Sequence, residues 1–125
     1  MALHGDPAAA LAALEDAEEA VHGSLEACPG CRIAFAVPAA IAAARAGRLD
    51  LAEPYDPAVA YLANVVMRLP AWYAALEEVR AHIAWLRGDG EGVAAGHFAT
   101  AARGLREIGQ SFDTACCDAL AADVR

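Results

Sequence analysis

The sequence predicts an all-α protein, and three observations carry that prediction. Alanine is the commonest residue of a chain that is 58% hydrophobic, and alanine has the highest intrinsic helix propensity. Branched aliphatic residues do not gather into strand-like runs, because alanines dilute even the nearest candidate at residues 33–37. A glycine followed closely by an aspartate recurs roughly every 40 residues, a spacing typical of stacked helical units. At 125 residues the chain is long enough for one domain with a core.

The recurring glycine–aspartate pattern begins at Gly5, Gly47 and Gly88 and divides the chain into three units. We expect these units near residues 5–46, 47–87 and 88–125, within a single helical-repeat domain. Two helices per unit would lie antiparallel, because short connections join neighbours. The predicted architecture is therefore an antiparallel helix-pair array of five to six helices.

The first two helices are expected at residues 8–21 and 31–46. Asp6 is a suitable N-cap for the first, and Pro7 suits the first helical position. Pro38 lies inside the second and removes a backbone donor, so we expect a kink there or a later start near residue 37. Gly47 should end this helix.

The remaining helices are expected at residues 57–68, 71–87, 91–108 and 112–123. Residues 49–53 could begin a further helix, but Pro54 and Pro57 interrupt it. Residues 71–87 show the clearest periodicity, which predicts one narrow buried seam. Its members are Trp72, Leu76, Val79, Ile83 and Leu86. His82 lies beside this seam and should be partly exposed. Glu77 and Glu78 are expected to be solvated, as acidic residues on helices usually are.

Charge and hydropathy exclude two classes of protein. The net charge is −8, lysine is absent and the arginines are scattered, whereas nucleic-acid binders usually carry a basic stripe. The longest apolar stretch, 33–44, contains a proline and is shorter than the roughly 20 residues that a membrane span needs. No signal peptide is recognisable at the N-terminus. We therefore expect a cytoplasmic protein without a direct nucleic-acid or membrane partner.

Two of the units share a pattern in which a small residue, a large one and a small one follow the glycine. The pattern is Ala10, Leu14 and Ala17 after Gly5, and Ala94, Phe98 and Ala101 after Gly88. It resembles the second helix of a tetratricopeptide unit. The stretch from Gly88 to Gln110 is similar to the C-terminal helical arrays of bacterial LuxR-type and other multidomain signalling regulators. The chain contains no P-loop pattern and no basic helix-turn-helix signature.

The resemblance implies a non-enzymatic module for protein or peptide interaction, or for sensing, in a bacterial transcriptional regulator. The partner would be a protein or peptide, and self-association would also cover exposed helix faces. Aromatic residues and arginine concentrate binding energy at interfaces. The candidate contact residues are Tyr61, Tyr73, Arg80, Trp85 and Arg87.

The four cysteines leave an alternative open. Cys28 and Cys31 enclose Pro-Gly at the start of a predicted helix, where the helix N-terminus favours a thiolate and thiol–disulfide exchange. The same pair has zinc-ligand spacing, with Cys116 and Cys117 as further ligands, although adjacent cysteines form a poor tetrahedral site. The third interpretation is that all four are reduced structural thiols. We expect no cofactor, with zinc as the alternative.

Overall fold

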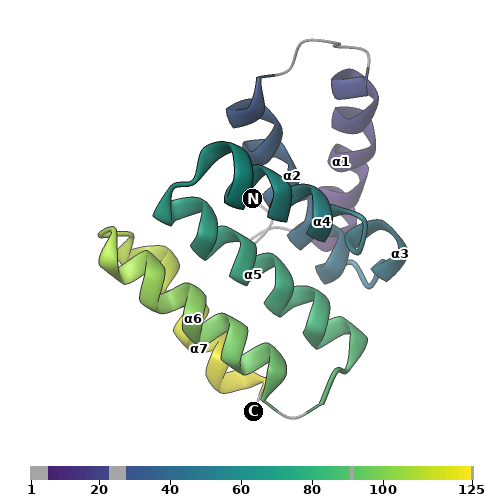
Figure 1. Ribbon diagram of the computed structural model, residues 1–125. Helices are drawn as coiled ribbons and strands as arrows, with labels where there is room; N and C mark the ends of the chain where they lie inside the picture. The colour runs from purple at the N-terminus through teal and green to yellow at the C-terminus, as the bar shows by residue number, and fades with distance from the viewer. Residues whose placement is uncertain (1–5, 23–27, 91, 125) are drawn as a thin grey trace.

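The computed structural model describes residues 6–22, 28–90 and 92–124, and this part of the chain is helical and has no strand (Figure 1). Six helices form it, together with the single turn α3 and the π-helical segment η1. The elements are α1 (Pro7–His22), α2 (Pro29–Arg45), α3 (Leu49–Ala52), α4 (Tyr55–Tyr61), η1 (Leu62–Met67), α5 (Pro70–Arg87), α6 (Val93–Glu107) and α7 (Ser111–Asp123). The prediction of an all-α fold is confirmed. The tetratricopeptide-like superhelix stays a prediction.

Helix α5 occupies the centre of the molecule. It runs between α4 and α6 in Figure 1, and it packs most extensively against α6, which returns antiparallel to it. On its other side α5 contacts α2, α3, α4 and η1. Helix α7 packs on α6, and α1 packs on α2. A helix that is covered on two sides must bury more than one stripe of its surface.

Three clusters of buried side chains form the core, and α5 contributes to each. Val79 and Ile83 join residues of α1, α2 and α3. Leu76 joins Ile33 of α2 and residues of α4 and η1. On the opposite side, Ala74 and Ala81 join α6 and α7 around Phe98, which is fully buried. The largest side chain of the repeat pattern therefore fills the space between α5 and α7.

Three glycines end helices in the same way. Gly47, Gly88 and Gly109 all adopt positive φ, between 73° and 80°, one or two residues beyond the ends of α2, α5 and α6. In each case the next residue donates its backbone N–H to a carbonyl five positions earlier, as in Ala43–Arg48 and Ala84–Asp89. These helix ends agree with the sequence prediction. Gly5, the first member of the predicted period, lies outside the described residues.

Two helix starts differ from the prediction. Helix α2 begins at Pro29 and continues through Pro38, so a start near residue 37 is wrong. The Cys28 side chain caps the first turn and Pro29 has a suitable φ, which together favour the earlier start. Helix α4 begins at Tyr55 rather than at residue 57, and the chain changes to π-helical geometry at Leu62.

The predicted seam of α5 is only partly correct. Leu76, Val79 and Ile83 are buried, but Leu86 is exposed. Two polar residues expected near solvent are buried instead, since Glu78 is 8% exposed and His82 is 4% exposed. The reason is that α6 and α7 cover the second face of α5, which a single seam does not anticipate. Among the described residues, no helix is both long and apolar enough to cross a membrane.

Candidate functional site

Cys28 and Cys31 meet at the N-terminus of α2. Cys28 occupies the N-cap position, and its Sγ accepts the backbone N–H of Cys31 at 3.2 Å. The two Sγ atoms are 2.8 Å apart, within hydrogen-bonding distance of each other. Both residues are exposed. A pair of accessible thiols at the positive end of a 17-residue helix has the arrangement that thiol–disulfide exchange requires.

The two thiols of this pair differ in acidity. The pKa of Cys28 is lowered, first by the hydrogen bond with the Cys31 thiol and then by the backbone N–H of Cys31. The pKa of Cys31 is raised by the same contact, because a proton shared between two sulfurs stays with one of them. The contact therefore favours Cys28 as the thiolate of the pair and Cys31 as the thiol that keeps its proton.

Cys116 and Cys117 lie on α7, a different part of the fold. Cys117 is fully buried, and burial, followed by the charge of Glu78, raises the pKa of its thiol to about 12. Within residues 6–22, 28–90 and 92–124, no three His, Cys, Asp or Glu side chains come together as a metal-binding group. The four cysteines are thus not assembled into the predicted zinc site, and Cys28 and Cys31 together offer two ligands.

Two of the five candidate contact residues share a groove. Tyr73 and Arg80 stand two helical turns apart on α5 and line a hollow of about 350 Å³ between η1, α5 and α6. Asn64 of η1 and Arg103 of α6 form its opposite walls. The floor is the close contact between Ala74 and Gly104. The groove combines an exposed aromatic ring with a small-residue floor and charged rims.

The other candidates lie elsewhere. Trp85 is 46% exposed and lines a second pocket, between α2, α5 and α7. Tyr61 is exposed at the end of α4, and it is not part of either pocket. Arg87 lies at the C-terminal end of α5. The three aromatic candidates are thus exposed, but they belong to separate surfaces.

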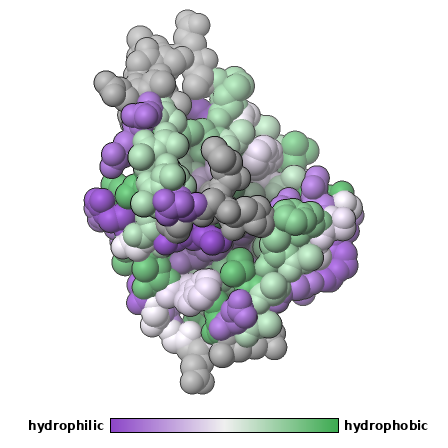
Figure 2. Space-filling view, turned by 180° about the vertical axis from the view of Figure 1, so that it is seen from behind, coloured by the Kyte–Doolittle hydropathy of each residue, from purple (hydrophilic) through white to green (hydrophobic). Residues whose placement is uncertain are grey.

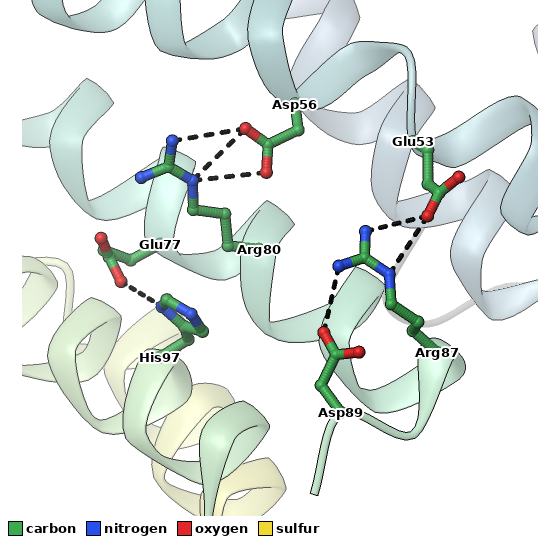
Figure 3. Close-up of polar contacts among 7 residues, drawn as sticks. All are labelled: Glu53, Asp56, Glu77, Arg80, Arg87, Asp89 and His97. Atoms are coloured by element: carbon green, nitrogen blue, oxygen red, sulfur yellow. Dashed lines mark hydrogen bonds and ion pairs between the residues drawn. The ribbon is translucent and has the colours of Figure 1, made fainter.

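The two arginines among the candidate contact residues, Arg80 and Arg87, form intramolecular ion pairs (Figure 3). Arg80 binds the carboxylate of Asp56 on α4, with nitrogen–oxygen distances of 3.3 Å. Arg87 bridges Glu53 at 2.9 Å and Asp89 at 3.1 Å. These pairs tie α5 to the segment around α4. Their guanidinium groups are consequently less available to a partner than the sequence suggests.

A third pair in Figure 3 connects α5 to α6. Glu77 Oε2 lies 2.6 Å from His97 Nδ1, and both side chains are only partly exposed. Glu77 was expected to be solvated. Its contact with His97 instead adds a polar link beside the groove, at the helix pair that packs most extensively.

Sequence reasoning missed two buried titratable residues, Glu78 and His82. Burial first, and then the negative charge of Asp113, raises the pKa of Glu78 to about 7. Burial first, and then the positive charge of Arg45, lowers the pKa of His82 to about 4. The signal that could have revealed them is the run of alanines at positions 74, 81 and 84, which marks a second close-packed face on α5.

Hydrophobic and hydrophilic residues are intermixed on the face seen in Figure 2. Comparisons with protein-family models, with curated proteins and with solved structures find no match to this chain. Inference about function therefore rests on the sites described above and on the residue pattern after the recurring glycines.

Proposed function

We propose that the chain is a helical interaction module of a bacterial regulator, and that it binds a peptide segment in the groove between η1, α5 and α6. The observation that carries the proposal is the groove itself. It is about 350 Å³ in volume and is lined by Tyr73, an exposed aromatic residue of the type that dominates binding energy. A role in the cytoplasm and in transcriptional regulation belongs to the same proposal and is supported by the tetratricopeptide-like residue pattern.

The surroundings of the groove support an apolar anchor. Exposed hydrophobic side chains follow one another from η1 to the start of α5, at Val65, Val66, Leu69 and Tyr73. Such a concentration on a small domain is typical of an interaction surface. The π-helical geometry of η1 adds to this, since π-segments occur frequently at functional sites.

The charges around the groove define the second feature of the ligand. Asp56 neutralises Arg80 and His97 binds Glu77, whereas the Arg103 guanidinium has no carboxylate within ion-pair distance among the described residues. Arg103 is therefore the cation that remains for a ligand. The preferred segment would place an apolar side chain against Tyr73 and an acidic residue against Arg103.

Selection from a displayed peptide library on the full chain tests this function. We expect enriched peptides to share an apolar residue with an acidic neighbour. Their affinity should fall about tenfold or more with Tyr73→Ala, and less with Arg103→Gln. Trp85→Leu is the matched control, because Trp85 is an exposed aromatic residue of the same helix outside the groove. Peptides that bind Tyr73→Ala as tightly as the wild type, or a library that yields no enrichment, would contradict the proposal.

A second candidate function, thiol–disulfide exchange, is favoured by the contact between Cys28 and Cys31. In the proposed reaction the Cys28 thiolate attacks one sulfur of a disulfide substrate, forming a mixed disulfide and expelling a thiolate. Cys31 then loses its proton and attacks Cys28 Sγ, which expels the second substrate thiolate. The pair is oxidised by two electrons, the substrate disulfide is reduced, and the two protons of the dithiol balance the two product thiols.

Titration of the reduced protein with glutathione disulfide tests this second function. The expected product is a single intramolecular disulfide in the peptide that contains Cys28 and Cys31, with two thiols lost per chain. Cys28→Ser should abolish the reaction, while Cys31→Ser should stop at the glutathione adduct. Cys116→Ser is the control and should leave the reaction unchanged. Metal analysis of the same preparation decides between this function and zinc binding by the pair.

A further inference from the structure

The pocket beside Trp85 has features of a ligand site that peptide binding and thiol exchange do not use. It lies between the C-terminal end of α2, the second half of α5, and α7, and has a volume of about 420 Å³. That volume falls within the range of small-molecule sites in proteins. Its walls are Ala44, Arg45, His82, Trp85, Leu86 and Leu120. Four of the six are apolar or aromatic, and the two polar groups are a guanidinium and an imidazole.

His82 is the unusual residue of this pocket. Its side chain is 4% exposed, and its Nε2 atom has no hydrogen-bond partner among the described residues. Buried polar atoms in folded proteins are nearly always paired, because an unpaired one loses its hydration without compensation. Because Nε2 is closed to solvent, a ligand in the pocket does not reach this nitrogen, and His82 contributes only the small accessible part of its side chain to the wall.

Phe98 of α6 fixes the rings that form this wall. The His82 ring meets Phe98 edge to face at a centroid distance of 4.9 Å, and the Trp85 ring does the same at 6.2 Å. Phe98 itself is fully buried. His82 and Trp85 are therefore held before any ligand arrives, which reduces the entropy that binding must overcome.

Arg45 supplies the positive charge of this pocket. It lies in the last turn of α2, is exposed, and has no carboxylate within ion-pair distance in the part of the chain that the structure describes. Its positive charge is close enough to His82 to contribute to the lowered pKa of the imidazole, which is consequently neutral near pH 7. A guanidinium offers a planar pair of donors that matches a carboxylate.

We infer that the pocket between α2, α5 and α7 binds a small organic carboxylate with an apolar or aromatic body. The carboxylate lies against the Arg45 guanidinium, and the body lies against Trp85, Leu86 and Leu120. Trp85 and Leu86 are both partly open to solvent, so the ligand enters from their side. This binding is independent of the peptide groove, which lies on the part of α5 that carries Tyr73 and Arg80.

Tryptophan fluorescence provides a direct test, because the chain has two tryptophans and Trp72→Phe leaves Trp85 as the only reporter. The probes are benzoate and cyclohexanecarboxylate, with benzamide as the neutral analogue of benzoate. We expect saturable changes with both carboxylates at micromolar to millimolar concentrations, and affinity for benzamide lower by about tenfold or more. Calorimetry on the chain with both tryptophans should rank the affinities of the three probes in the same order.

Variants separate the proposed contacts from general effects of charge. Arg45→Gln should weaken benzoate binding about tenfold or more, and this exposed residue can be replaced without disturbing the core. Arg32→Gln is the matched control, because Arg32 is an exposed arginine of the same helix outside the pocket. In addition, benzoate should shift the His82 ring resonances in NMR spectra and leave those of His97 unchanged. No saturable response to either carboxylate, equal affinity for benzamide, or an unaffected Arg45→Gln variant would overturn the inference.

Discussion

Gly104 of α6 lies directly against Ala74 of α5, so that a Cβ atom added to Gly104 would be only 3.1 Å from the Cβ of Ala74. This contact lies at the floor of the peptide groove and between the two helices that pack most extensively. Ala74 is buried in the cluster around Phe98. The absence of a side chain at Gly104 thus permits the close approach that defines both the core and the groove.

The first prediction compares this glycine with another on the same helix. Gly96 is exposed and has nothing within 4 Å of an added Cβ, so Gly96→Ala should stabilise the protein by up to about 1 kcal/mol through helix propensity. Gly104→Ala should gain clearly less or lose stability, because Ala74 must move to admit the methyl group. Denaturation in urea measures both. Equal stabilisation by the two substitutions would show that the contact is not tight.

The second prediction concerns the helix end at Gly88. This residue has φ +73°, a conformation that places the Cβ of an L-amino acid against the following carbonyl. Gly88→Ala should therefore cost about 1–2 kcal/mol of unfolding free energy. Gly88→Asn should cost less, since asparagine tolerates the left-handed region better. The midpoint of urea denaturation checks this order, and an alanine variant as stable as the asparagine variant would contradict it.

The third prediction is a pH dependence that belongs to Glu78. Its pKa is raised from 4.5 to about 7 in the folded state, so the folded protein holds more protons than the unfolded chain between these values. The contribution of Glu78 to the free energy of unfolding is consequently fully present below pH 4.5. It decreases by roughly 3 kcal/mol as the pH rises to about 7. Glu78→Gln should be more stable than the wild type above pH 7 by a similar order and should lose this advantage near pH 4.

His82 acts in the opposite direction over part of the same range. Its pKa is lowered from 6.5 to about 4, so its contribution to stability increases as pH rises from 4 to 6.5. The two residues partly compensate in the wild type, and Glu78→Gln should reveal the rising limb. Urea denaturation of both proteins from pH 4 to pH 8 provides the measurement. Parallel stability curves for the two proteins would contradict the buried, neutral state of Glu78.

The fourth prediction ranks the cysteines by their rates of alkylation in the folded protein. Cys28 should react first, because it is exposed and its pKa is lowered by the Cys31 thiol. Cys117 should react last, because it is fully buried and its pKa is raised to about 12 by burial. Its neighbour Cys116 is partly exposed and serves as the internal comparison. Mass spectrometry after timed N-ethylmaleimide treatment gives the order, and early labelling of Cys117 would show that α7 detaches from α6.

Local rules predicted the helices well. Alanine content indicated the all-α class, and Gly47, Gly88 and Gly109 were expected to end helices, where positive φ is required. The start of α2 was less predictable, because Pro38 suggested an interruption. The structure tolerates that proline inside the helix, since Ala34, whose carbonyl would have accepted the missing hydrogen bond, lies on an exposed position.

What the sequence by itself determined is therefore the set of helices and their approximate ends. Only the tertiary structure decided that Glu78 and His82 are buried, and that Tyr73 and Trp85 line separate pockets. The physical reason is that helix ends depend on neighbours within a few residues, whereas burial on α5 depends on α2, α6 and α7, which reach it from distant parts of the chain.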